Sequence, residues 1–69
     1  MPVISVEGPP VSDVSKKREF VQSITDAALS LFDVPRSAIV ILFKENRPEN
    51  VGVGGRLLVD RMDGDQKGD

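Results

Sequence analysis

Hydrophobic residues open the chain in a short run. Val3-Ile4-Ser5-Val6 is mostly β-branched and apolar, and Glu7-Gly8-Pro9-Pro10 follows it with residues that favour turns. A β-branched run bounded by glycine and proline is typical of a short strand. We therefore predict a first strand at the amino terminus.

The next stretch has the periodicity of a helix. Its apolar residues recur at spacings of three and four and fill an arc of roughly 140° on a helical wheel; they are Phe20, Val21, Ile24, Ala27, Ala28, Leu31 and Phe32. Ser12-Asp13 offers an N-cap. Asp33-Val34-Pro35 ends the pattern, because the residue before a proline favours extended backbone. We predict an amphipathic helix from about Asp13 to Leu31, with Leu29 outside the arc and directed towards another subunit.

A second strand is predicted at Ala38–Phe43, where the apolar run is continuous. Such strands are covered on both faces and are typical of parallel partners in a β-α-β unit. A single amphipathic helix covers only one face, so we expect a second copy of the chain to cover the other. The alternative is a monomer with an exposed apolar strand, which is prone to aggregate. The predicted fold class is α/β (α+β), a β-α-β subunit whose sheets are joined between subunits.

The last third of the chain predicts a small appendage. Val51-Gly52-Val53-Gly54-Gly55 indicates a hairpin or a flexible strand, and Arg56–Arg61 either a short helical turn or a closing strand. We expect one domain over residues 1–61. Residues 62–69 lack apolar content after Met62, and this composition predicts a disordered polar tail.

Composition excludes several classes of function. The chain has 69 residues, with no cysteine and no histidine, which removes disulfides, thiol nucleophiles and histidine acid–base chemistry. Nine basic and eleven acidic residues give a net charge of −2, so we expect no nucleic-acid partner. The longest apolar run, Ala38–Phe43, is too short to span a bilayer, and no signal peptide is visible. We expect a cytoplasmic protein that needs no metal or organic cofactor and does not bind membranes. Gly52, Gly54 and Gly55 lack the spacing of a nucleotide-binding loop, so we do not expect the chain to bind a nucleotide.

Pro2 has candidate chemistry because it follows the initiator methionine. Methionine before a small residue is normally removed, which leaves proline with a free secondary amine. Desolvation and nearby cations lower the pKa of an amine, and such a nitrogen can act as a general base near neutral pH. If Met1 remains, the nitrogen is an amide without basicity. Taken alone, Pro2 is better explained as the first residue of an edge strand.

Cations are the other candidates for a site. Lys16-Lys17-Arg18 lies at the start of the predicted helix, and Lys17 falls near the middle of the apolar arc. One interpretation directs Lys17 towards an anionic substrate; the alternative has its stem covering apolar surface while the ammonium reaches water. Further cations lie near predicted strand ends and turns, where each is more simply a surface charge: Arg36, Lys44, Arg47 and Arg56.

The ordered set of features resembles the 4-oxalocrotonate tautomerase family of the tautomerase superfamily, the enzymes with an amino-terminal proline. The features are Pro2 after Met1, a short strand, Ser12-Asp13-Val14-Ser15-Lys16, Asp33-Val34-Pro35, an apolar second strand and Asn50-Val51-Gly52-Val53-Gly54-Gly55. The likeness covers about residues 2 to 61. It implies a β-α-β subunit that dimerises through its sheet, and commonly a hexamer built from three dimers.

The resemblance implies that Pro2 is the general base of a tautomerase that interconverts the enol and keto forms of a small unsaturated 2-hydroxy or 2-oxo acid. Other family positions depart from the pattern. The arginine expected before the helix falls at about Val11, the arginine of the second strand at Val40, and the aromatic residue at about Val51. Val51 still offers an apolar wall.

Without those two arginines, other cations are left to bind the substrate. The candidates by position are Lys17, Arg36 and Arg47, with Lys16 and Lys44 as further possibilities. Two alternatives to a tautomerase stay open. One is a decarboxylase, or a hydratase or dehalogenase, that uses the same proline. The other is a non-catalytic module that assembles through its apolar strand.

Overall fold

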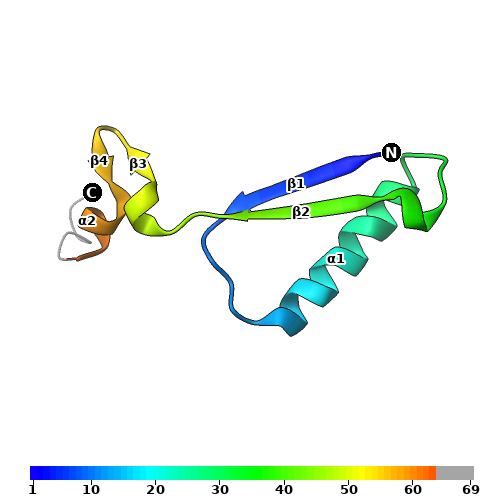
Figure 1. The fold of residues 1–69 in the computed structure, drawn as a ribbon, viewed down its shortest axis with the longest axis horizontal. Coiled ribbons are helices and arrows are strands. Elements are labelled where there is room, and N and C mark those ends of the chain that lie inside the picture. The colour runs from blue at the N-terminus through cyan, green and yellow to red at the C-terminus, as the bar shows by residue number, and fades with distance from the viewer. Residues whose placement is uncertain (64–69) are drawn as a thin grey trace.

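Residues 1–63 fold into eight elements that follow one another in a simple order. The computed structural model describes residues 1–63. Its elements, labelled in Figure 1, are β1 (Val3–Gly8), α1 (Val14–Leu29), the 3-10 turn η1 (Arg36–Ala38), β2 (Val40–Glu45), the 3-10 turn η2 (Pro48–Asn50), β3 (Gly52–Val53), β4 (Arg56–Leu57) and α2 (Leu58–Asp63). The predicted β-α-β fold with a carboxyl-terminal hairpin is confirmed.

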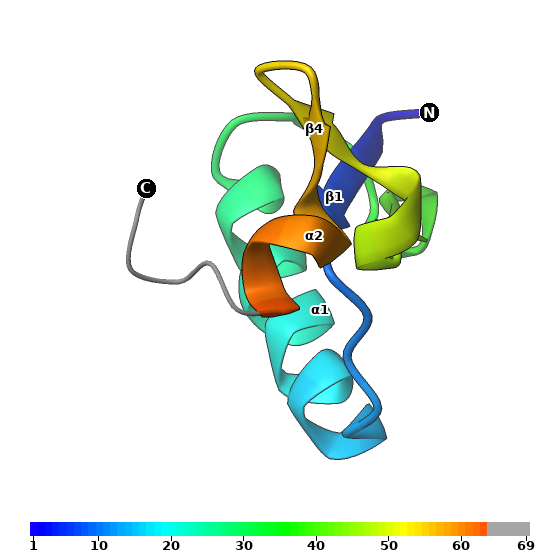
Figure 2. The same cartoon turned by 90° about the vertical axis from the view of Figure 1, so that its left-hand side faces the viewer.

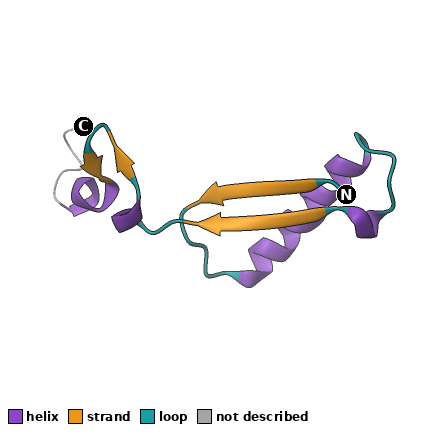
Figure 3. Ribbon diagram, turned by 45° about the horizontal axis from the view of Figure 1, so that its top comes forward, coloured by secondary structure: helices purple, strands orange, loops and turns teal. Residues whose placement is uncertain are grey.

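β1 and β2 form a parallel pair, and α1 connects them along one face (Figure 3). The register runs from Val3 opposite Val40 to Gly8 opposite Glu45. The predicted position of the second strand is two residues too early. Ala38 belongs to η1, where its N–H donates to the carbonyl of Pro35 at 2.9 Å. Proline's fixed φ favours such a turn, and the strand begins only after it.

The helix begins at its predicted cap. The Oδ1 of Asp13 accepts hydrogen bonds from the N–H groups of Ser15 at 3.0 Å and Lys16 at 3.3 Å. These bonds satisfy donors that the first turn leaves without partners. At the other end Ser30 caps the helix, and its Oγ donates to the carbonyl of Ala27 at 2.7 Å. Leu31 lies beyond the helix and is 77% exposed, so its predicted place on the buried face is wrong.

Few side chains are buried between α1 and the sheet. The rings of Phe20 and Phe43 lie 5.7 Å apart, and within residues 1–61, where burial is defined, Ala28 alone is fully buried. Side chains alternate between the faces of a strand, so Leu42, next to Phe43, lies on the face away from α1. Leu42 is 47% exposed and Val3 is 48% exposed. The open face of the sheet is therefore apolar and uncovered in a single chain.

Residues 48–63, which we call the arm, form a separate carboxyl-terminal unit. β3 and β4 pair antiparallel around Gly54 and Gly55, whose φ angles of 62° and 87° are those that a tight hairpin requires. The N–H of Leu58 donates to the carbonyl of Val51 at 2.7 Å and closes the unit. Figure 1 shows the arm set apart from α1 and the β1–β2 sheet, and Figure 2 views the molecule from the arm's end. The molecule is accordingly elongated, at 47 × 25 × 17 Å.

The sequence predicted either a helical turn or a closing strand at Arg56–Arg61, and the structure of the arm contains both. Arg56–Arg61 forms both a closing strand, β4, and the start of a helical turn, α2. α2 continues to Asp63, two residues past the predicted domain boundary, and the rest of the predicted tail lies outside the described residues. None of the helices within the described range has the length and apolarity needed to cross a membrane.

Candidate active site

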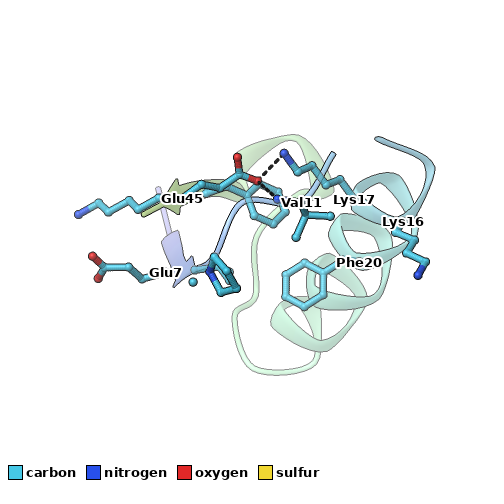
Figure 4. Close-up of a pocket in the computed structure, with 11 residues that line it drawn as sticks. Glu7, Val11, Lys16, Lys17, Phe20 and Glu45 are labelled. Atoms are coloured by element: carbon cyan, nitrogen blue, oxygen red, sulfur yellow. Dashed lines mark hydrogen bonds and ion pairs between the residues drawn. The ribbon is translucent and has the colours of Figure 1, made fainter. Parts of the chain in front are cut away.

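A hollow lies where the carboxyl ends of both parallel strands meet the first turns of α1 (Figure 4). Its volume is about 420 Å³, within the range of small-molecule sites. The residues that line it are Val6, Glu7, Gly8, Pro9, Val11, Lys16, Lys17, Phe20, Phe43, Lys44 and Glu45. We refer to this feature as the hollow.

The local sequence explains why three elements converge there. Pro9 and Pro10 lack an N–H and cannot continue the ladder beyond Gly8, so the chain leaves the sheet. Asp13 then starts α1 only a few residues later. Because β1 and β2 are parallel, both strands end at this same edge. Ligand sites in parallel sheets commonly lie at the carboxyl ends of the strands.

Apolar side chains make up most of the wall. Val6 and Phe43 are opposite each other in the strand register, and Phe20 reaches them from α1. Figure 4 shows Phe20 and Val11 on the helix side of the hollow. This surface suits the hydrocarbon part of a ligand, since an apolar group that enters it leaves water.

A single ionic cluster lies inside this apolar frame. The Nζ of Lys17 lies 2.6 Å from the Oε2 of Glu45, and the same oxygen accepts a hydrogen bond from the N–H of Val11 at 3.2 Å (Figure 4). The ammonium also lies 5.6 Å from the ring centre of Phe43, within cation–π range. The side chains of Lys17 and Glu45 are only 26% and 30% exposed, so solvent screens this pair less than a fully exposed one.

The cluster changes the acidity of Glu45. Hydrogen bonding from Lys17, and then from the Val11 N–H, holds the pKa of the Glu45 carboxyl below its ordinary value of 4.5. Partial burial opposes this effect without cancelling it. Glu45 therefore stays ionised at neutral pH and joins the end of β2 to both the loop before α1 and the helix itself.

The remaining charges lie at the rim. Glu7 and Lys16 point away from the centre of the hollow on opposite sides (Figure 4). Glu7 accepts a hydrogen bond from the Nδ2 of Asn46 at 3.1 Å. Lys16 and Lys44 are both exposed. Lys44 shares the strand face of Leu42, away from α1, so Lys16 is the solvated lysine on the helix side of the hollow.

Pro2 lies at the opposite end of the sheet. It precedes β1, and its carbonyl accepts a hydrogen bond from the N–H of Val40 at 3.0 Å. β1 has six residues and spans about 20 Å, which separates Pro2 from the hollow within one chain. Pro2 is half-buried, whereas Met1 before it is 86% exposed.

The other candidates are dispersed as well. Arg36 lies in η1, at the Pro2 end of the sheet, and pairs with Asp26 at 2.8 Å. Arg47 follows β2 beyond the hollow and pairs with Glu49 at 3.0 Å. Val51 lies in the arm. Of the candidate site residues, Lys17 lines the hollow, together with the further candidates Lys16 and Lys44, whereas Pro2, Arg36, Arg47 and Val51 do not.

Glu45, Phe20 and Phe43 were not predicted from the sequence as residues of a site. A weak signal was present, because Phe43 and Glu45 are two apart on a strand and so share a face. Lys17 and Phe20 are three apart on a helix and also share one. Nothing in either spacing shows that the face of the strand and the face of the helix meet.

Within residues 1–63 no group of three or more acidic side chains is arranged to hold a metal ion.

Comparison with known proteins gives a consistent result. A sequence profile described as "Tautomerase enzyme" matches residues 2–61. The crystal structure of DmpI from Archaeoglobus fulgidus is 52% identical, with a TM-score of 0.73, over 86% of this chain and all of that chain. A 4-oxalocrotonate tautomerase homologue is 30% identical, with a TM-score of 0.78, over 87% of this chain and 95% of that one.

A third similar structure is TomN, a 4-oxalocrotonate tautomerase homologue in the tomaymycin biosynthetic pathway. It is 27% identical, with a TM-score of 0.75, over 87% of this chain and 92% of that one. No protein with a curated functional description matches the chain.

Proposed function

The chain belongs to the tautomerase family, and from that premise we propose that it is a keto–enol isomerase whose general base is the nitrogen of Pro2. The substrate class is a small unsaturated 2-hydroxy or 2-oxo acid, as in 4-oxalocrotonate tautomerases. No metal or organic cofactor takes part in the proposed reaction.

The observation that carries the proposal is the setting of Pro2. Its carbonyl is held by Val40, so the ring is fixed at the start of β1, while the exposed Met1 contributes no strand pairing. Removal of Met1 therefore costs the fold little. It leaves a half-buried secondary amine at a fixed position, and such an amine can exchange a proton near neutral pH.

The proposed step is a proton transfer that conserves all atoms. The proline nitrogen removes the hydroxyl proton of the enol, and the electron pair of the oxygen forms the carbonyl. The displaced double-bond electrons take a proton from the prolinium at carbon, which restores the free amine. Negative charge gathers on the oxygen during this transfer, and a nearby cation or backbone N–H stabilises it.

The proposed active site includes two copies of the chain. Pro2 and the hollow lie at opposite ends of β1, about 20 Å apart. A two-fold axis that pairs two such sheets with antiparallel strands brings the Pro2 end of one copy to the hollow end of the other. Both sites of the dimer are then completed in the same way.

Features of the single chain support self-association. The open face of the sheet exposes Val3 and Leu42, while only Ala28 is fully buried within residues 1–61. A chain of this size normally needs more buried apolar surface to be stable. The arm also extends away from α1 and the sheet, where it can reach a neighbouring subunit (Figure 1). We propose a dimer joined through the sheets, and a hexamer of three dimers as the assembled enzyme.

The test is ketonisation of a 2-hydroxydienoate by the wild type and by Pro2→Ala, with mass spectra showing that both chains have lost Met1. We expect turnover by the wild type and a loss of about 10²–10⁴-fold in the variant, the usual contribution of a general base. Product identity separates tautomerisation from decarboxylation or hydration on the same proline. Equal rates in both proteins, or full retention of Met1, would overturn the proposal and favour a non-catalytic assembling module.

A further inference from the structure

The joint between the sheet and the arm is short. The ladder of β1 and β2 continues for one residue past β2, because the N–H of Asn46 donates to the carbonyl of Gly8 at 2.8 Å. The arm begins at Pro48, the first residue of η2. Arg47 is therefore the single residue between the last hydrogen bond of the sheet and the first element of the arm.

The sheet side of this joint is held by a side chain as well as by the backbone. The Nδ2 of Asn46 donates to the Oε2 of Glu7 at 3.1 Å, and Glu7 belongs to β1. Asn46 is half-buried. We call the bonded side chains of Asn46 and Glu7 the latch. The latch ties the segment that leads into the arm to the end of the neighbouring strand.

The arm side of the joint restricts the backbone of Arg47. A residue that precedes a proline is confined to extended backbone, and Arg47 has a φ of −72° and a ψ of 152°. Its carbonyl accepts a hydrogen bond from the N–H of Asn50 at 2.8 Å, which ties it to η2. With the latch on one side and Pro48 on the other, the arm keeps one direction relative to the sheet.

This direction keeps the arm away from the apolar surface of its own chain. Figures 1 and 3 show the arm beyond the carboxyl end of β2, whereas the open face of the sheet runs back along the strands towards Val3. The arm exposes apolar side chains of its own, with Val53 at 50% and Leu57 at 43% exposure. A single chain thus has two exposed apolar surfaces that it cannot bring together. A second copy of the chain can cover surface that the first copy leaves in water.

We infer that the latch and Pro48 hold the arm in a fixed direction, and that the arm so held is a surface through which one copy of the chain binds a second. The inference rests on the self-association proposed above and names the residues that prepare the chain for it. An arm that is already ordered loses little conformational entropy on binding, so copies associate more tightly than they would through a flexible arm. Glu7 and Asn46 act as positioning residues, because they fix the arm without having to touch the second copy.

The experiment is sedimentation equilibrium of the full chain over a dilution series, which gives the dissociation constant between copies. Asn46→Ala removes the donor of the latch and keeps the backbone N–H of the ladder, so we expect association to weaken by about 3- to 10-fold, the value of one hydrogen bond. Pro48→Gly releases the backbone at residues 47 and 48. We expect association to weaken by about 10- to 100-fold, because that backbone must then be ordered on binding.

The contact surface of the arm is tested separately from its direction. Leu57→Ser leaves the latch intact and removes an exposed apolar side chain, so we expect association to weaken by about 10-fold or more. Leu31→Ser is the matched control, because Leu31 is also exposed but lies beyond α1, far from the arm. Equal association of the wild type and Leu57→Ser would show that the arm is not the contact surface.

Three further variants identify the latch as the cause. Glu7→Gln keeps an oxygen that accepts from Asn46 and should associate like the wild type. Asn50→Ala removes the same kind of side chain from η2 with the latch intact, and should also have no effect. Glu7→Ala and Asn46→Ala break one and the same bond, so their double variant should associate no more weakly than either alone. Additive losses would contradict a shared positioning role.

The outcomes separate this inference from the proposed function. A wild type that stays monomeric over the whole dilution series would overturn the proposed self-association, and this inference would fail with it. If the wild type associates and neither Asn46→Ala nor Pro48→Gly weakens it, the self-association stands and the role of the latch is wrong. Circular dichroism of each variant shows whether a weaker association comes from unfolding instead. None of these readouts depends on Pro2, whose role as the base is tested by turnover.

Discussion

At the scale of single residues, two carboxylates hold the start of α1 from opposite directions. Asp13 bonds backbone N–H groups of the first turn from within the helix. Glu45 reaches across from β2 to Lys17 and to the loop at Val11. Together they fix the side of the hollow that faces α1, so changes at either residue should be measurable in stability.

The contribution of Glu45 to stability should depend on pH. Its pKa is lowered in the folded chain by Lys17 and the Val11 N–H, so the ionised form is favoured by folding. The stabilisation is therefore complete above the ordinary value of 4.5 and is lost as pH falls through the lowered folded pKa. We expect Glu45→Gln to unfold at a lower temperature than the wild type near neutral pH, and the difference to shrink in acid.

Thermal unfolding of both proteins across the acid range checks this prediction. The neighbouring charges Glu7, Lys16 and Lys44 line the same hollow and are unchanged in the comparison. A difference in unfolding temperature that stays constant as the pH falls would contradict the assigned linkage.

The helix cap makes a separate prediction. Asp13→Ala removes the acceptor for the N–H groups of Ser15 and Lys16, which should cost about 1 kcal/mol of unfolding free energy. Asp13→Ser retains a capping oxygen and should recover most of that loss. Denaturant unfolding measures both, and equal stability of the alanine variant and the wild type would show that the cap contributes nothing.

At the scale of elements, the arm and the β1–β2 pair are stabilised by different interactions. The pair is joined by a parallel ladder and packs on α1 through Phe20 and Phe43. The arm is a two-residue hairpin closed by the Leu58–Val51 hydrogen bond. Its shape depends on the backbone of its turn, because strands this short contribute few other contacts.

Gly55 should be the residue on which the arm depends most. Its φ of 87° is one that side chains with a Cβ rarely adopt, so Gly55→Ala should destabilise the arm by about 1–2 kcal/mol. Gly52→Ala is the matched control, because a Cβ there meets only the Arg56 carbonyl at an ordinary 3.8 Å. Faster amide exchange of Leu58 in Gly55→Ala alone would confirm the effect, and equal exchange in both variants would contradict it.

At the scale of the whole molecule, a single chain is incomplete. It is 47 Å long, has an apolar open sheet face, and separates Pro2 from the hollow by the length of a strand. The association of copies through the sheet that we propose would account for all three features. Such association buries apolar surface and shortens the distance between the two ends of the proposed site.

A charge on the open face should therefore prevent assembly. Leu42 is 47% exposed on that face, and Leu42→Lys would bury an ammonium without a partner in any sheet-to-sheet contact. We expect the variant to sediment as a monomer with reduced thermal stability, and the wild type as a dimer or hexamer. Leu31→Lys is the control, because Leu31 is 77% exposed beyond the end of α1 and should not matter. A monomeric wild type would overturn the argument.

Much of the fold could be predicted from the sequence, because local patterns are physical consequences of short-range structure. The spacing of Phe20, Val21 and Ile24 predicted the helix, and Asp13 predicted its start. Gly54 and Gly55 predicted the hairpin, since few other residues adopt positive φ. Element ends were less accurate. Leu31 fits the pattern of the helix and Ala38 that of the second strand. The helix, however, ends before Leu31, and Ala38 belongs to the 3-10 turn η1.

The candidate site was less predictable for a different reason. The sequence by itself determined the elements. It singled out Pro2 and Val51 through its resemblance to a family, and Arg36 and Arg47 by their positions in the chain; the roles of all four stay predictions. Only the tertiary structure decided that Lys17 meets Glu45. That contact joins residues 28 positions apart, and it depends on the parallel register and on how α1 crosses the sheet. No local pattern encodes those two quantities, because both are set by the packing of the whole chain.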